Sequence, residues 1–102
     1  METSVAVTGS VATVDIMGRF DFSAHRGFKE AYDPLLGNSS VTAIVIDLSG
    51  VDYMDSSALG MLLMLRERAQ GVSKKVSLSR PNHTVSQILD IANFAKLFSI
   101  SK

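Results

Sequence analysis

The chain has 102 residues, of which 46% are apolar and 20% are charged, and this excludes the low-hydrophobicity, high-charge composition of a disordered protein. Its length predicts a single domain over residues 1–102. Ten Lys and Arg balance ten Asp and Glu, so no net positive charge would attract nucleic acid or an anionic membrane. The absence of cysteine excludes disulfides and thiolate metal sites, and the N-terminus lacks the pattern of a secretory signal, so we expect a cytoplasmic protein.

The first forty residues predict a β-hairpin followed by a helix. Residues 4–17 alternate β-branched or apolar residues with small or polar ones, and Gly9-Ser10 separates the two halves. Gly18 interrupts this alternation, so we expect the second strand to end there. Either Asp21 or Ser23 can then cap a helix. The end of that helix is marked by Pro34 and Gly37.

The middle of the chain predicts a buried strand that leads into a second helix. Residues 41–48, VTAIVIDL, are nearly all apolar and rich in Val and Ile, which is typical of a central strand covered on both faces. We expect Ser49-Gly50 to break this strand and residues 51–55, VDYMD, to form a loop. A helix then begins at Ser56 and stops at Gly71.

The last third predicts a strand, a helix and a short edge segment. Residues 76–79 form the strand, and Asn82 or Thr84 caps a helix with apolar residues three and four positions apart. Residues 94–101 close the chain with a turn and a short edge segment. The order β-β-α-β-α-β-α plus a C-terminal strand predicts an α/β fold with a mixed sheet, parallel pairing through right-handed crossovers, and helices mainly on one face.

Catalytic and metal chemistry finds no support in the sequence. His25 and His83 are the only imidazoles, and we expect both to be surface or capping residues. The chain has no GxSxG motif, no GxGxxG motif and no GxxxxGK[ST] loop. We therefore expect no catalytic residue, no bound metal and no cofactor, and conclude that the chain is not an enzyme.

The segment MDSSALG places a serine where a buried strand gives way to an apolar helix. By local physics Ser56 is the N-cap of that helix, a role worth about 1 kcal/mol. A phosphate on Ser56 would add about −1.5 to −2 charges at the helix N-terminus, next to Asp55. A partner suited to the neutral hydroxyl would then be repelled.

The helix after Ser56 is apolar around more of its circumference than one buried face requires. Counting about 100° per residue separates two stripes. The stripe that we expect in the core consists of Ala58, Leu62, Leu65 and Ala69. The other stripe consists of Ser57, Met61, Met64 and Arg68. It either packs against a neighbouring helix or forms an exposed, adaptable docking face beside Ser56, and both interpretations stay open.

Residues 47–69, DLSGVDYMDSSALGMLLMLRERA, closely resemble the signature of bacterial STAS domains, and specifically of anti-sigma-factor antagonists. The resemblance extends to residues 18–22, GRFDF, and to residues 88–100, ILDIANFAKLFSI. It covers nearly the whole chain, with two departures from the common pattern. These are Ala58 in place of a glycine and Arg19 where an acidic residue is frequent.

This resemblance implies a phosphorylation-controlled partner switch. The phosphoacceptor is Ser56, with Asp55 and Ser57 as its neighbours, and Ser57 is the less favoured target. The implied partners are an anti-sigma factor or GHKL-type serine kinase, which binds the unphosphorylated form, and a PP2C-type phosphatase, which restores it. We expect partner contacts from Met61, Met64, Arg68 and Asp21. The free protein would be a monomer; the alternative is a non-switching STAS subunit of a transporter or signalling scaffold.

Overall fold

The computed structural model describes all 102 residues. Its strands are β1 (Glu2–Thr8), β2 (Val11–Phe20), β3 (Ala43–Met54), β4 (Lys75–Ser79) and β5 (Ser99–Ser101). Its α-helices are α1 (His25–Leu36), α2 (Ser56–Gly71) and α3 (His83–Ile91), and two short 3₁₀ helices are η1 (Phe22–Ala24) and η2 (Phe94–Lys96). None of the helices is long and apolar enough to cross a lipid bilayer.

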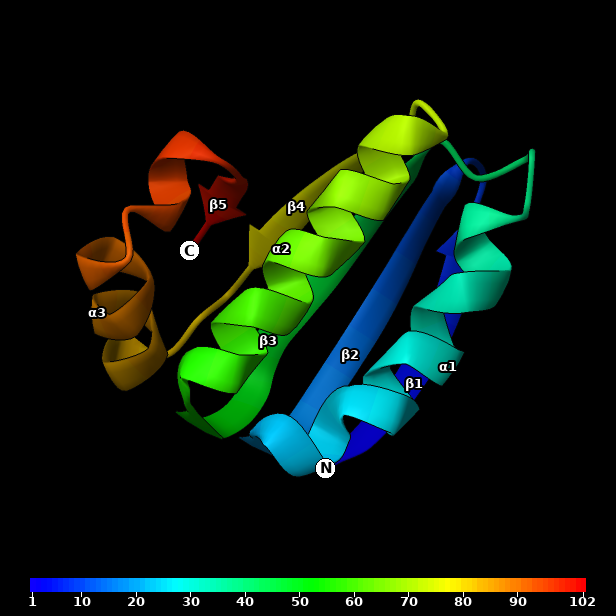
Figure 1. Cartoon of the computed structure of the whole chain (residues 1–102). Coiled ribbons are helices and arrows are strands. Elements are labelled where there is room, and N and C mark those ends of the chain that lie inside the picture. The colour runs from blue at the N-terminus through cyan, green and yellow to red at the C-terminus, as the bar shows by residue number, and fades with distance from the viewer.

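The five strands form one sheet in the order β1-β2-β3-β4-β5. Only β1 and β2 pair antiparallel, and every other neighbouring pair is parallel. Helices α1 and α2 lie side by side over one face of the sheet, and α3 lies beyond β4, next to η2 and β5 (Figure 1). A single core joins the inward side chains of the central strands to residues from all three helices. The predicted α/β class, the mixed sheet and the helices on one face are confirmed.

The first hairpin forms as predicted, but its second strand is longer than expected. Thr8 pairs with Val11, and Gly9 adopts a φ of +61°, so the loop is a two-residue turn with glycine at its first position. Strand β2 does not end at Gly18, where φ is +93°. Its pairing with β3 shifts register on both sides of Met17 and Gly18, and this irregularity carries the strand on to Phe20.

Strand β3 also continues beyond its predicted end. Ser49 and Gly50 do not break it, and the segment expected to be a loop remains strand as far as Met54. Gly50 pairs with Met17 on β2, where an added Cβ would lie 2.7 Å from the Met17 Cγ atom. Gly50 therefore allows β2 and β3 to approach closely and does not mark a turn. Because of this, β3 delivers the start of α2 to the same end of the sheet as the end of β2.

The sheet face opposite the helices carries an ionic group around one buried carboxylate, that of Asp47. Asp15 and Asp47 are directly paired on β2 and β3, and Arg80 binds the Asp47 carboxylate. Burial acts to raise the pKa of Asp47, but hydrogen bonds from Arg80 and from Ser49 prevail and lower it from 3.8 to about 2. Burial and the neighbouring Asp47 raise the pKa of Asp15. Arg80 thus holds one of two adjacent carboxyl groups in its charged form.

Replacing a core leucine of α2 tests the packing of the helix on the sheet. Leu62 is 0% exposed, whereas its neighbour Leu63 is 38% exposed. We expect Leu62→Ala to lower the free energy of unfolding by about 2 to 5 kcal/mol, because it leaves a cavity in the core. Leu63→Ala, the matched control, should lower it by less than about 1 kcal/mol. Urea unfolding measures both, and equal losses would contradict this placement of α2.

The ionic group predicts a particular loss of stability in acid. The depressed pKa of Asp47 means that its contribution is complete above pH 3.8 and is lost as the pH falls towards 2. Arg80→Ala should raise the pKa of Asp47, so that this variant loses less stability than the wild type between those pH values. Urea unfolding at several pH values, with a carbon NMR titration of the carboxyl groups, measures both effects. Identical pH profiles would show that Arg80 does not hold the Asp47 charge.

Candidate functional site at the start of helix α2

Ser56 is held at one end of the sheet by the strand that precedes it. Met54, the last residue of β3, is 3% exposed and anchors the chain in the core. The backbone N–H of Asp55 then donates to the carbonyl oxygen of Phe20 at the end of β2, with 3.4 Å between N and O. Helix α2 begins at the next residue, so the turn before Ser56 is fixed from both sides.

Asp55, and not Ser56, is the N-cap of α2. Its backbone is extended, and its Oδ1 atom accepts a hydrogen bond from the Ala58 N–H at 3.0 Å. The prediction that the Ser56 hydroxyl caps the helix is therefore wrong, because the carboxylate one residue earlier already occupies that role. Ser56 is the first residue of the helix, and its side chain and that of Ser57 are exposed. The Ser56 hydroxyl is thus free of a structural duty and accessible to another protein.

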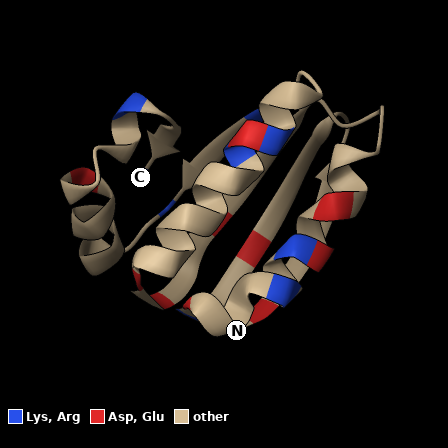
Figure 2. Ribbon diagram, viewed as in Figure 1, with Lys and Arg blue, Asp and Glu red and all other residues tan.

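A second carboxylate lies at the same end of the sheet. Asp21 directly follows Phe20 and caps η1, where it accepts hydrogen bonds from the N–H (3.1 Å) and hydroxyl (2.5 Å) of Ser23. These bonds, above all that from the hydroxyl, lower the pKa of Asp21. Arg19 lies 3.5 Å from Asp21 and stacks 4.1 Å from the centre of the Tyr53 ring. Acidic residues therefore gather where β3 ends and α2 begins (Figure 2).

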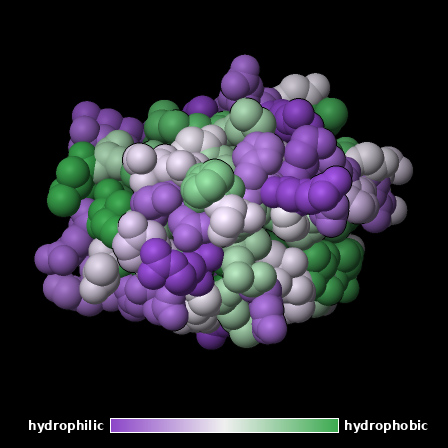
Figure 3. All heavy atoms as spheres, turned by 60° about the horizontal axis from the view of Figure 1, so that its bottom comes forward, coloured by the Kyte–Doolittle hydropathy of each residue, from purple (hydrophilic) through white to green (hydrophobic).

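An apolar groove runs beside Ser56, between the start of α2 and α3. Its volume is about 310 Å³. It is lined by Met54, Asp55, Ser56, Leu59, Ile88, Ile91 and Ala92. Ile91 is 83% exposed, the largest exposure of any large apolar residue in the chain. In the view of Figure 3, hydrophobic side chains gather at the left, over α3. Large apolar side chains left in water beside a groove are typical of a docking surface.

The sequence did not point to this groove. The spacing of apolar residues in the sequence predicted a helix near the C-terminus but gave no reason to place that helix beside Ser56. Ile91 carried the only available signal, because it lies outside the three-and-four spacing that buries Val85 and Leu89. An isoleucine at the exposed end of a short helix is unusual enough to be noted as a candidate contact.

The two stripes of α2 have different outcomes. The predicted core stripe is confirmed, because Ala58, Leu62, Leu65 and Ala69 are all 0% exposed. In the other stripe, Met61 is only 6% exposed, so of the two interpretations left open the structure supports packing against a neighbouring helix at this residue. Arg68 pairs with Asp33 on α1 at 3.6 Å, which shows that this stripe faces α1. Met64, which is 43% exposed, and Arg68 remain accessible.

The structure thus brings Asp21, Asp55, Ser56 and Ser57 to one end of the molecule, and places Met64 and Arg68 further along α2. Nowhere in the chain do three or more His, Cys, Asp or Glu side chains cluster as a metal site would require. His25 begins α1 and His83 begins α3, and both are exposed. What the site offers chemically is an accessible hydroxyl at a helix N-terminus beside carboxylates and an apolar groove.

Comparison with known proteins places the chain among others with this architecture. A family model described as "Mlab, STAS domain" matches residues 3–99. A STAS-domain containing protein of Pseudomonas aeruginosa (strain UCBPP-PA14) is 45% identical over 93 residues, which cover 91% of this chain and 90% of that protein. The anti-sigma F factor antagonist of Lysinibacillus sphaericus is 23% identical over 86 residues, which cover 84% of this chain and 74% of that protein.

Solved structures share the fold. The anti-sigma factor antagonist SpoIIAA in its unphosphorylated form has a TM-score of 0.81 at 19% identity, covering 99% of this chain and 89% of that one. Bacillus SpoIIAA in its phosphorylated form has a TM-score of 0.74 at 18% identity, covering 99% and 92%. The STAS domain of a SulP transporter from Vibrio cholerae has a TM-score of 0.75 at 22% identity, covering 95% and 77%. At these identities the likeness establishes the fold alone.

Because Asp55 caps α2 and Ser56 does not, replacing each residue by alanine should affect stability differently. Asp55→Ala removes the N-cap and should lower the free energy of unfolding by about 1 kcal/mol. Ser56→Ala should change it by less than about 0.5 kcal/mol, because the exposed hydroxyl makes no cap hydrogen bond. Thermal and urea unfolding of both variants measure the difference. A larger loss for Ser56→Ala than for Asp55→Ala would contradict the assignment of the cap.

Proposed function

The chain belongs to the STAS-domain family, and we propose that it is an anti-sigma-factor antagonist whose binding to its partner is controlled by phosphorylation of Ser56. The observation that carries this proposal is the exposed Ser56 hydroxyl at the start of α2, left free because Asp55 caps the helix. The name of the Lysinibacillus relative supports the function, and the 45% identical Pseudomonas protein supports the family. In this proposal the chain is the substrate of other enzymes and is not itself a catalyst.

Phosphorylation would change the charge of the docking surface without changing the fold. A kinase would transfer the terminal phosphoryl group of ATP to the Ser56 oxygen, releasing ADP and the hydroxyl proton. The product carries about −1.5 to −2 charges at neutral pH. The first N–H groups of α2 favour an anion there. Asp55 and Asp21 lie at the same end, so the added charge increases an existing negative potential, and the helix remains capped throughout.

The apolar groove explains why this charge would matter to a partner. Ser56 lines the groove together with Leu59, Ile88 and Ile91. A partner that inserts apolar side chains into the groove must remove water from the Ser56 side chain as well. Desolvating a hydroxyl is tolerable when it finds a hydrogen bond, whereas desolvating a phosphate without a cation is far more costly. The phosphate would therefore oppose docking at the rim of the groove.

The partners in this proposal are an anti-sigma factor or GHKL-type serine kinase, which binds the unphosphorylated form, and a PP2C-type phosphatase, which hydrolyses the phosphoserine to serine and inorganic phosphate. Leu59, Ile88 and Ile91 provide the apolar contact, and Met64 and Arg68 extend it along α2. Met61 has no part in it because it is buried. A cytoplasmic location fits partners that use ATP.

A second candidate function is a permanent STAS subunit of a transporter or signalling scaffold. It is favoured by the family description, which names Mlab, and by the STAS domain of the SulP transporter, which shares the fold. In that case the same groove would hold its partner regardless of the state of Ser56. A complex of equal affinity with Ser56 phosphorylated and unphosphorylated would favour this second function.

Substitutions at Ser56 distinguish the two functions. We expect Ser56→Asp to weaken binding to the anti-sigma factor by at least about tenfold, since a buried charge is left without a counter-ion. Ser56→Ala should bind like the wild type and accept no phosphate from the kinase and ATP, whereas Ser57→Ala, the matched control, should still be phosphorylated. Calorimetric titration and intact-protein mass spectrometry measure these results. Wild-type affinity in all three variants would refute the switch.

A further inference from the structure

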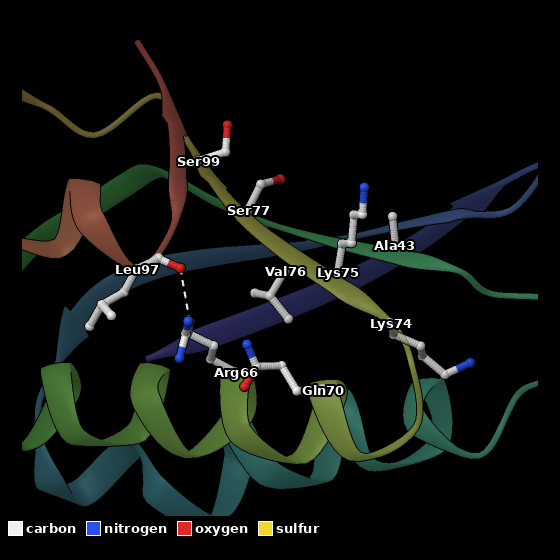
Figure 4. Close-up of a pocket in the computed structure, with 9 residues that line it drawn as sticks. All are labelled: Ala43, Arg66, Gln70, Lys74, Lys75, Val76, Ser77, Leu97 and Ser99. Carbon is white, nitrogen blue, oxygen red and sulfur yellow. Dashed lines mark hydrogen bonds between the residues drawn. The ribbon is translucent and has the colours of Figure 1, made fainter.

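The largest cavity of the molecule lies at the far end of α2 from Ser56. Its volume is about 420 Å³, and it opens along the outer edge of β4, between the last turns of α2 and the start of β5 (Figure 4). Arg66 and Gln70 border it from α2, and Val76 points from β4 toward that helix. Arg66 follows Ser56 by ten positions, or about 15 Å along the helix axis. The cavity is therefore separate from the candidate site.

The edge of the sheet is open at this cavity. Strand β4 begins at Lys75, but β5 pairs with it only from Ser77 to Ser79. The Lys75 N–H donates inward to the Thr42 carbonyl oxygen on the β3 side, at 3.1 Å. The C=O of the same peptide group, that of Lys74, points the opposite way, and the N–H of Val76 also faces outward, whereas the parallel pairing of Ser77 with Ser99 engages the Val76 C=O. An unpaired strand edge of this kind is a template for another extended segment.

The cavity is also the one place where uncompensated positive charge is concentrated. The five ion pairs of the chain engage Arg19, Arg26, Lys29, Arg68 and Arg80. The other five Lys and Arg residues have no carboxylate within 4.0 Å, and three of these, Arg66, Lys74 and Lys75, line the cavity. No Asp or Glu lines it. In a chain with a net charge of zero, this is a local cationic site.

Two of these cations are held in place by carbonyl groups. Lys74 is 8% exposed, and its ammonium group donates to the carbonyl oxygens of Val41 and Asn38, the latter at 2.7 Å. The Nε atom of Arg66 donates to the Leu97 carbonyl oxygen at 2.8 Å, a bond visible in Figure 4. This bond uses one of the five N–H donors of the guanidinium and leaves the terminal nitrogens for an incoming carboxylate.

We propose that this cavity binds an extended acidic segment of a partner protein, which adds to the free edge of β4 and places its carboxylates against Arg66 and Lys75. The outward C=O of Lys74 and N–H of Val76 select a peptide, because one residue of an extended strand presents the matching donor and acceptor. The cations select acidic side chains. Lys75 points to the side of β4 opposite Val76 and Arg66, so two successive residues of the segment meet cations on opposite faces of the sheet.

The test uses the full-length chain and the synthetic hexapeptide Ser-Val-Glu-Glu-Val-Ser, blocked at both ends, because adjacent Glu residues face opposite sides of a strand. The matched probe is the peptide with Lys in place of both Glu residues. In a nitrogen NMR titration, only the Glu peptide should shift the amide signals of Lys75 and Val76 and the side-chain signal of Arg66. Binding should weaken as NaCl rises from about 50 to about 500 mM. The amide of Val76 should exchange more slowly with solvent when the Glu peptide is bound, while that of Lys75 should not change.

Variants distinguish binding at this cavity from nonspecific attraction to the positive charge of the surface. Arg66→Ala/Lys75→Ala should weaken binding of the Glu peptide by at least about tenfold. Lys96→Ala/Lys102→Ala, which removes two equally unpaired cations outside the cavity, should bind like the wild type. Ser56→Asp should also bind like the wild type, so that this result does not depend on the proposed switch. Three results would overturn the proposal. They are equal binding of both peptides, a Val76 amide that exchanges no more slowly with the Glu peptide than without it, and full reproduction of the shifts by inorganic phosphate.

Discussion

The hydrogen bond from the Ala58 N–H to the Asp55 carboxylate, 3.0 Å between N and O, fixes where helix α2 begins. It depends on β3 arriving at the right point, which requires the strand to pass Gly50 without breaking and to end at the buried Met54. Because Asp55 supplies the cap, Ser56 stands in the first turn with a hydroxyl that stabilises nothing. A residue with no structural duty can be modified without loss of the fold, which is what a reversible switch requires.

The electrostatic character of the molecule changes along α2. At its start, Asp55 and Asp21 surround Ser56, and the neighbouring groove is apolar. At its end, Arg66 and Lys75 border a cavity that contains no carboxylate. The net charge of zero conceals this separation, so the composition alone gave no indication of a local acidic or basic surface. The two proposed partners would therefore meet ends of opposite character, and only the partner at Ser56 would respond to the phosphate.

Patterns that depend on nearby residues were predicted well from the sequence. The hairpin at Gly9, the start of α2 and the core stripe of α2 follow from turn chemistry and periodicity, and the structure confirms them. Of the two residues predicted to cap α3, Asn82 and Thr84, the structure selects Asn82. The sequence was less informative where contacts between residues distant in the chain determine the structure. Gly50 looked like a strand break because its real role, close approach to Met17, is invisible along the chain. Whether Met61 is buried or exposed stayed open because the sequence does not show that α1 packs along that side of α2. The groove beside α3 joins segments thirty residues apart, so no local pattern marked it.

The proposed phosphorylation switch is tested by the affinity of the anti-sigma factor for the chain with phosphoserine installed at position 56, compared with phosphoserine at position 57 and with the unmodified chain. Calorimetry gives the affinities, and a nitrogen NMR spectrum of each free protein reports the fold. A switch at Ser56 predicts a large loss of affinity for the phosphate on Ser56, a smaller one for the phosphate on Ser57, and spectra that change only near the start of α2. Equal affinity of all three proteins, or a loss caused by unfolding of α2, would contradict it.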